Sequence, residues 1–180
     1  MYMYFIAIVL PENLNEKILK LKNLMLEKYD CKVGLKSPAH ITLVPPFWMN
    51  EEKEQELISD IDSISSALQP FVVATKNFSA FKPRTIFIDV GVTEQLKSVK
   101  IAADKFFSLR PDYRVKVETR PFHPHITIAT RDLHKKAFHD AWPLFEHKTF
   151  TEEWNAEGIS LLRHNKKNWN VIHTSQFKTN

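Results

Sequence analysis

The amino-acid sequence predicts a mixed α/β (α+β) fold made of two related halves. Helix-type and strand-type hydrophobic patterns alternate along the 180 residues. The tetrapeptide His-Ile-Thr-aliphatic occurs at 40–43 and again at 125–128. The composition, with 43% hydrophobic and 26% charged residues, is that of a chain able to bury a core. Because the repeat has only two copies, it favours a pair of lobes over a solenoid.

The first quarter of the chain predicts a strand, a helix and a second strand. Residues 2–9 are apolar and end before Pro11. No basic segment or cleavage site accompanies them, so they are interpreted as a buried strand and not as a signal peptide or membrane span. An Asn-x-x-Glu start signal and an apolar stripe predict a helix over 13–29. A short apolar run predicts a strand over 39–44.

The middle of the chain continues the alternation. A helix is expected after Asn50, because acidic residues fill its first turn and apolar residues recur at helical spacing up to position 68. Alternating patterns predict strands over 71–78 and 84–90. The next apolar stripe predicts a helix over 93–109.

The last third predicts more strands and a weaker helix. Strands are expected over 113–118 and 124–129, and a helix is expected to begin near Asp132 and to stop at Pro143 because proline interrupts helices. The remaining strand signals lie near 148–153, 157–163 and 168–174. Each copy of the repeat therefore lies on a strand that leads into a helix.

The repeated tetrapeptide places polar and apolar side chains on opposite faces of its strand. Side chains alternate along a strand, so His40 and Thr42 share one face while the intervening aliphatic residues occupy the other. The same holds for His125 and Thr127. If the two halves face each other, the groove between them receives two imidazoles and two hydroxyls.

This set of groups suits phosphodiester chemistry without a metal. One neutral imidazole can take a proton from an attacking hydroxyl or water, and one protonated imidazole can give a proton to the leaving oxygen. An ordinary histidine titrates near pH 6.5, so both forms coexist near neutrality. The threonine hydroxyls can donate to the phosphate oxygens, on which negative charge is held.

Three other interpretations of these residues remain open. The two histidines can be hydrogen-bonded strand residues without a catalytic role. His123 and His125 can form half of a metal site, although no carboxylate or cysteine stands at ligand spacing. The groove can also belong to a catalytically silent RNA-binding module, for which replacing His40 and His125 would leave RNA affinity unchanged.

The stretches AHITLVPPF (39–47) and RPFHPHITIATRD (120–132), together with the order of strands and helices, resemble the 2H phosphoesterase superfamily. The similarity is to the branch of 2′-5′ RNA ligases and RNA 2′,3′-cyclic phosphodiesterases, and it extends over nearly the whole chain. It implies one bilobal, pseudo-twofold domain over 1–180, with two sheets, helices on the outer faces and a central cleft carrying both motifs.

The resemblance also implies metal-independent catalysis on RNA 2′,3′-cyclic phosphate ends, related cyclic nucleotides or 2′-5′ phosphodiesters. His40, Thr42, His125 and Thr127 are then the catalytic residues. Ligation to a 2′-5′ bond is the reverse reaction in the same site, so both directions remain open.

Five further residues near the motifs are candidates for substrate binding. Phe47 and Phe122 flank the two motifs and can stack on a base. Arg84, Arg120 and Arg131 can reach a phosphate.

The remaining expectations concern partners and location. A net charge of +4 suits an anionic ligand such as an RNA end or a small nucleotide phosphodiester. No glycine-rich phosphate loop is present, so a Rossmann or Walker site is not expected. No cofactor or metal is expected, the single cysteine, Cys31, is interpreted as a free thiol, and a cytoplasmic monomer without membrane contact is predicted.

Overall fold

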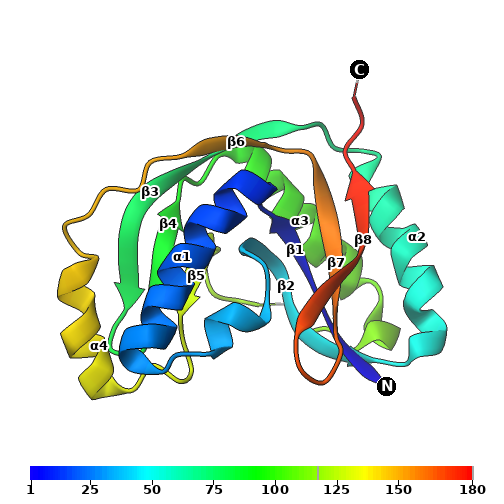
Figure 1. The fold of residues 1–180 in the computed structure, drawn as a ribbon. Helices are drawn as coiled ribbons and strands as arrows, with labels where there is room; N and C mark the ends of the chain where they lie inside the picture. The colour runs from blue at the N-terminus through cyan, green and yellow to red at the C-terminus, as the bar shows by residue number, and fades with distance from the viewer. Residues whose placement is uncertain (117, 180) are drawn as a thin grey trace.

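The computed structural model describes residues 1–116 and 118–179, and within them the chain forms two four-stranded sheets in which every strand pair is antiparallel (Figure 1). The first sheet has the order β2-β1-β7-β8, with β1 at Tyr2–Val9, β2 at His40–Met49, β7 at Gly158–His164 and β8 at Trp169–Gln176. The second has the order β5-β4-β3-β6, with β3 at Phe71–Phe81, β4 at Thr85–Val90, β5 at His125–Ala129 and β6 at Glu153–Ala156. The helices are α1 (Glu12–Tyr29), α2 (Glu54–Ser65), α3 (Glu94–Ser108) and α4 (Lys135–Ala141).

The two halves repeat one order of elements. The first half runs β1-α1-β2-α2 and the second runs β4-α3-β5-α4. In each half the strand that carries the His-Ile-Thr motif lies at the end of its sheet and pairs with the strand that begins the unit. The two motif strands, β2 and β5, contact each other. The expected two-sheet α/β (α+β) fold is therefore confirmed.

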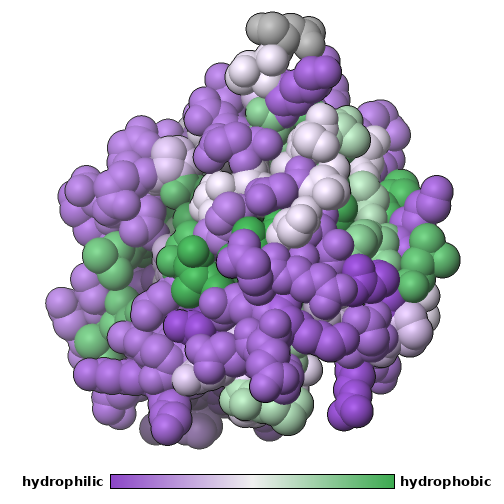
Figure 2. Space-filling model, turned by 90° about the vertical axis from the view of Figure 1, so that its right-hand side faces the viewer, coloured by the Kyte–Doolittle hydropathy of each residue, from purple (hydrophilic) through white to green (hydrophobic). Residues whose placement is uncertain are grey.

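The helices cover the sheets. Helix α2 packs against β7 and β8, while α3 packs against β2 and β3. Helix α1 packs against β5 and contacts α4, and it crosses in front of β4 and β5 in Figure 1. The face on the α2 side is mostly hydrophilic, with smaller hydrophobic patches (Figure 2). Among the described residues, no helix has the length and apolar character needed to span a membrane.

Strand β1 is buried on both faces, as its continuous apolar run predicts. Tyr4, Ile6 and Ile8 belong to the large hydrophobic core. The alternate residues Phe5 and Ala7 belong to a smaller cluster on the other face. This second cluster matters for function because the Phe5 ring lies 4.8 Å from the ring of His40.

The predicted strand over 113–118 is wrong for the residues that the structure describes, and residue 117 lies outside them. Tyr113 ends a 3₁₀ turn, Pro111–Tyr113, and Arg114 has a left-handed backbone with φ of 54°. The turn is fixed because the buried Tyr113 hydroxyl donates to Asp60 at 2.6 Å. The Pro-Asp turn signal outweighs the alternating pattern that follows it.

Two other boundaries differ from the sequence expectation. The strand expected near 148–153 is β6 at Glu153–Ala156, while residues 148–152 run beside β3 through isolated hydrogen bonds such as Thr75 N to the Glu152 carbonyl. The fourth helix is shorter than expected and ends at Ala141. Pro143 lies in the 3₁₀ turn that follows it.

A glycine allows the segment before β2 to pack directly on the second motif strand. A Cβ atom built on Gly34 would lie 2.4 Å from the Ile128 carbonyl oxygen, which is backbone and has little room to move. We expect Gly34→Ala to lower the free energy of unfolding by about 1–3 kcal/mol, as overpacking does. Urea unfolding measures this.

Gly91→Ala is the matched control, because a Cβ on Gly91 would meet neighbours at 3.4 Å, an ordinary contact. If the two variants have equal free energies of unfolding, Gly34 does not pack directly against the backbone of β5.

Candidate active site

The two motifs lie on the neighbouring strands β2 and β5, and each strand shows the predicted alternation. The aliphatic residues Ile41 and Ile126 are both 0% exposed, whereas the motif histidines and threonines are half-buried. The aliphatic side chains fix each strand against the core, and the polar ones point to the opposite face. Thr42 from β2 and His125 from β5 line the same cavity of about 690 Å³, so one residue of each motif reaches it, while His40 and Thr127 are not among its lining residues.

The two motif histidines are held in the same way. His40 Nδ1 lies 2.7 Å from the Pro38 carbonyl oxygen, and His125 Nδ1 lies 2.8 Å from the His123 carbonyl oxygen. A carbonyl oxygen only accepts, so Nδ1 of each ring carries the hydrogen. Each Nε2 is then the atom that can take or give a proton. Within the described part of the chain, neither Nε2 has a hydrogen-bond partner.

Burial lowers the pKa of both motif histidines. The pKa of His40 falls from its ordinary value to about 4, mainly because burial disfavours the charged ring, with added repulsion from Lys22 and His125. The pKa of His125 is lowered by burial too, but the nearby Asp89 carboxylate opposes this. In the free protein at neutral pH, both imidazoles are therefore neutral.

Aromatic rings surround His125. The Phe81 ring meets the His125 ring edge-on at 5.2 Å, and the Phe87 ring lies 5.0 Å from it. These rings exclude water from one side of the imidazole and help to lower its pKa. Neither phenylalanine is near the motif in sequence, so their place here follows only from the pairing of β3, β4 and β5.

His123, the candidate for a metal site with His125, instead pairs with a carboxylate. Its Nε2 lies 2.9 Å from Asp89, while its carbonyl holds His125. Among the described residues, no three or more His, Cys, Asp or Glu side chains are grouped so that they could hold a metal ion. In this arrangement His123 supports the neighbouring motif histidine through its backbone.

The two motif threonines offer their hydroxyl groups to a ligand. Thr42 and Thr127 are half-buried, and among the described residues neither hydroxyl has a protein hydrogen-bond partner. Elsewhere in the fold, half-buried threonines are bonded, as Thr85 and Thr130 are to each other at 3.1 Å. The motif hydroxyls are therefore available to donate to an anion that enters between the strands.

The structure brings two of the five predicted substrate-binding residues to the cavity. Arg120 and Phe122 line it. Arg84 lies exposed in the turn between β3 and β4, and Arg131 lies exposed beyond the end of β5, and neither lines the cavity. Phe47 is only 5% exposed, and we exclude it from the substrate-binding set.

Phe47 is buried because β2 is longer than the sequence suggests. The strand continues to Met49, and this places the Phe47 ring in the core, 5.9 Å from Phe107 and 6.2 Å from Tyr4. A base at the cleft cannot reach a ring in that position.

Sequence reasoning missed the cationic residues near the site. Lys76 and Lys100 line the cavity. Lys22 is only 4% exposed and lies close enough to His40 to affect its pKa. The one available signal was the place of Lys22 and Lys100 among apolar helix positions, where a lysine is unusual.

Comparison with known proteins gives one family. The model of the 2′-5′ RNA ligase superfamily matches residues 10–168. A candidate phosphoesterase of Oceanobacillus iheyensis is 29% identical over 157 residues, which cover 84% of this chain and 86% of that protein. A candidate phosphoesterase of Bacillus cytotoxicus is 27% identical over 156 residues, which cover 84% of this chain and 86% of that protein.

Solved structures share the fold over the full length. The structure of TT0787 of Thermus thermophilus superposes with a TM-score of 0.72 at 19% identity, covering 98% of both chains. E. coli LigT complexed with 3′-AMP superposes with a TM-score of 0.63 at 17% identity, covering 99% of both chains.

Proposed function

This chain belongs to the 2′-5′ RNA ligase superfamily, and on that premise we propose that it is a metal-independent phosphodiesterase that opens 2′,3′-cyclic phosphates at RNA ends. His40 and His125 transfer the protons, and Thr42 and Thr127 hold the phosphate. The relatives that carry the name phosphoesterase support chemistry on phosphate esters.

One observation carries the proposal. Two imidazoles on adjoining strands each use Nδ1 to bind a backbone carbonyl two residues earlier, which leaves each Nε2 without a protein partner among the described residues. Two threonine hydroxyls accompany them, and in the described part of the chain these too have no protein partner. Two proton-transfer groups and two donors for phosphate oxygens are the parts that hydrolysis of a phosphodiester needs.

The surroundings of the two histidines favour different roles. His40 is the more deeply buried, with Lys22 nearby, and therefore stays neutral down to about pH 4. We assign it as the base that takes a proton from the attacking water. His125 has the Asp89 carboxylate near it, which favours its protonated form. We assign it as the acid that protonates the leaving ribose oxygen.

In this reaction the water oxygen bonds to phosphorus while one phosphorus–ribose oxygen bond breaks. One proton passes from water to His40 Nε2 and another from His125 Nε2 to the ribose oxygen, so a terminal phosphomonoester results. The threonine hydroxyls stabilise the charge on the non-bridging oxygens. If a 5′-hydroxyl of a second RNA end attacks phosphorus in place of water and the ribose 3′-oxygen leaves, the same two proton transfers join the two ends through a 2′-5′ bond.

The cavity suits a nucleotide. Its volume of about 690 Å³ is within the range of small-molecule sites. Phe81 and Phe122 offer apolar surface to a base, and Arg120 offers a charge to a phosphate. That a protein of this fold, LigT, has been crystallised with 3′-AMP supports a nucleotide that carries a phosphate on its ribose.

The proposal predicts a bell-shaped dependence of kcat/KM on pH with an acidic optimum. The profile of kcat/KM reports the free enzyme. Activity is lost below about pH 4, where His40 becomes protonated, and is lost again as the pH rises through the lowered pKa of His125, where the acid loses its proton. Bound phosphate is negative and raises both pKa values, so the profile of kcat should lie at higher pH.

Initial rates on a short RNA with a 2′,3′-cyclic phosphate, measured from pH 3 to 9, give both profiles. A kcat/KM that does not change with pH over this range would rule out two titrating imidazoles.

A further inference from the structure

A second, smaller cavity lies beside the site. It has a volume of about 260 Å³ and is formed by α1, by the segment that leads into β2, and by the start of β8 with the residue before it. Its volume is below the range of sites for whole small molecules, and it suits a phosphate group with part of its sugar. The lining residues are Asn15, Leu19, Lys22, Leu35, Lys36, Ser37, Pro38, Asn168, Trp169 and Asn170.

This second cavity is cationic. Lys22 is buried, and Lys36 is exposed at the rim. None of the described residues that line the cavity is acidic. Asn15 accepts a hydrogen bond from the Ala39 backbone through Oδ1 at 2.8 Å, which leaves its amide nitrogen as a donor. The two lysine ammonium groups and the Asn15 amide nitrogen are donors, and donors with positive charge favour an anion.

Among residues 1–116 and 118–179, Lys22 has no counter-ion. Its Nζ donates to the Ser37 carbonyl oxygen at 3.0 Å, and in the described part of the chain it has no other polar partner. An ammonium group has three donors, so two remain unused. A buried charge without a partner is costly, and the pKa of Lys22 accordingly falls to about 8.

Lys100, the buried lysine of α3, differs from Lys22 because it has a carboxylate partner. It lies beside the lead-in to the second motif, with its Nζ 5.9 Å from the centre of the Phe122 ring, but it is paired with Asp104 on the same helix. Both halves thus place a buried lysine near the segment before a motif. Only the first half leaves that lysine without a carboxylate among the described residues.

The two cavities are lined by residues that precede and follow His40 along the chain, although His40 itself is not among the lining residues of either. The larger one is lined by Thr42, Leu43 and Pro45, which follow His40 along β2, and the smaller one by residues 35–38, which precede it. Trp169, which lines the smaller cavity, meets Phe5 edge-on at 4.7 Å, and Phe5 lies against His40. A substrate with its reacting phosphate at His40 therefore has one cavity on each side.

We infer that the smaller cavity binds the phosphate of the nucleotide next to the reacting linkage, so that the substrate is an oligonucleotide end and not a cyclic mononucleotide. This inference rests on the proposed function, which places the reacting phosphate at His40. Lys22 and Lys36 supply the charge, and the Asn15 amide supplies a further donor.

Calorimetric titration with two dinucleotides tests this inference without requiring turnover. Both carry a terminal 3′-phosphate, and they differ in the internal linkage, which is a phosphodiester in one and an uncharged methylphosphonate in the other. Wild type should bind the phosphodiester about tenfold more tightly, as expected for a hydrogen-bonded buried charge. Lys22→Met should abolish this preference, and Lys36→Ala should reduce it about threefold because Lys36 is exposed.

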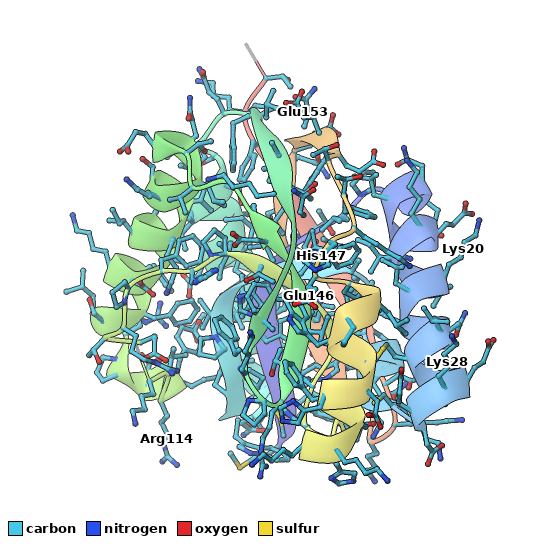
Figure 3. The ribbon with its side chains drawn as sticks, turned by 90° about the vertical axis from the view of Figure 1, so that its left-hand side faces the viewer. Lys20, Lys28, Arg114, Glu146, His147 and Glu153 are labelled. Carbon is cyan, nitrogen blue, oxygen red and sulfur yellow. The ribbon has the colours of Figure 1, made fainter. Side chains whose placement is uncertain are left out.

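Lys20→Ala is the matched control. Lys20 is exposed on the same helix and points away from the body of the protein (Figure 3). Its removal should leave the preference intact. Lys36→Ala keeps the test valid if Lys22→Met fails to fold, since Lys36 has no ion pair among the described residues.

A wild-type preference near one, or no binding of either dinucleotide, would overturn the inference. A preference near one, together with turnover that depends on His40, would show that the smaller cavity does not bind the internal phosphate. The proposed function would then still hold. A strong preference for the phosphodiester without any turnover would support the cavity as a phosphodiester-binding site and contradict the proposed hydrolysis.

Discussion

Replacing either motif histidine with alanine is expected to lower kcat on a cyclic-phosphate RNA end by about 10²–10⁴-fold, the range of general acid–base catalysis. His40→Ala removes the base and His125→Ala removes the acid, so each single change stops one of the two proton transfers. Because the two act as a unit, the double variant should lose little more than either single variant. Steady-state rates of the four proteins measure this.

His147→Ala provides the control. Its side chain is 88% exposed and lies on the segment after α4 (Figure 3), so kcat should not change. A silent RNA-binding module predicts a different pattern, in which wild type has no turnover and the two motif variants retain their RNA affinity. Full activity in either motif variant would show that the replaced histidine does not transfer a proton in the reaction.

Replacing a motif threonine with valine should have the second-largest effect. Thr42→Val and Thr127→Val keep the shape of the side chain and remove the hydroxyl, and the loss of one donor to a charged oxygen costs about 10²–10³-fold in kcat. The free energy of unfolding should change little, because neither hydroxyl has a partner among the described residues. Kinetics and urea unfolding of the same preparations separate the two effects.

Serine at either position should restore most of the activity, since it returns the hydroxyl without the methyl group. A loss of kcat that serine does not restore would assign the threonine to packing of the strand instead of to the phosphate.

The order of elements could be predicted from the sequence because each element is encoded locally. Leu14, Ile18 and Met25 recur at helical spacing and are buried on α1 as expected. The failures arose where a longer-range contact decided the structure. Tyr113 is held in a turn by Asp60, which is 53 residues away. The strand pattern around it carried no sign of this bond.

The residues of the candidate site could be predicted from the sequence, but the pKa values of its histidines could not. Strand alternation was enough to place His40 and Thr42 on one face. Burial of His40, the charge of Lys22 and the Phe5 ring depend on which elements pack together, and these contacts lower the pKa to about 4. The expectation that both protonation states coexist near neutrality therefore does not describe the free site. Substrate binding has to raise the pKa of the acid.

The most direct test of the central claim is turnover of a short RNA ending in a 2′,3′-cyclic phosphate, measured with and without a metal chelator. Two histidines that transfer protons without a metal predict equal rates in both conditions and a product with a terminal phosphomonoester. Activity that disappears in chelator and returns with zinc, or no opening of the cyclic phosphate at all, would contradict the proposed function.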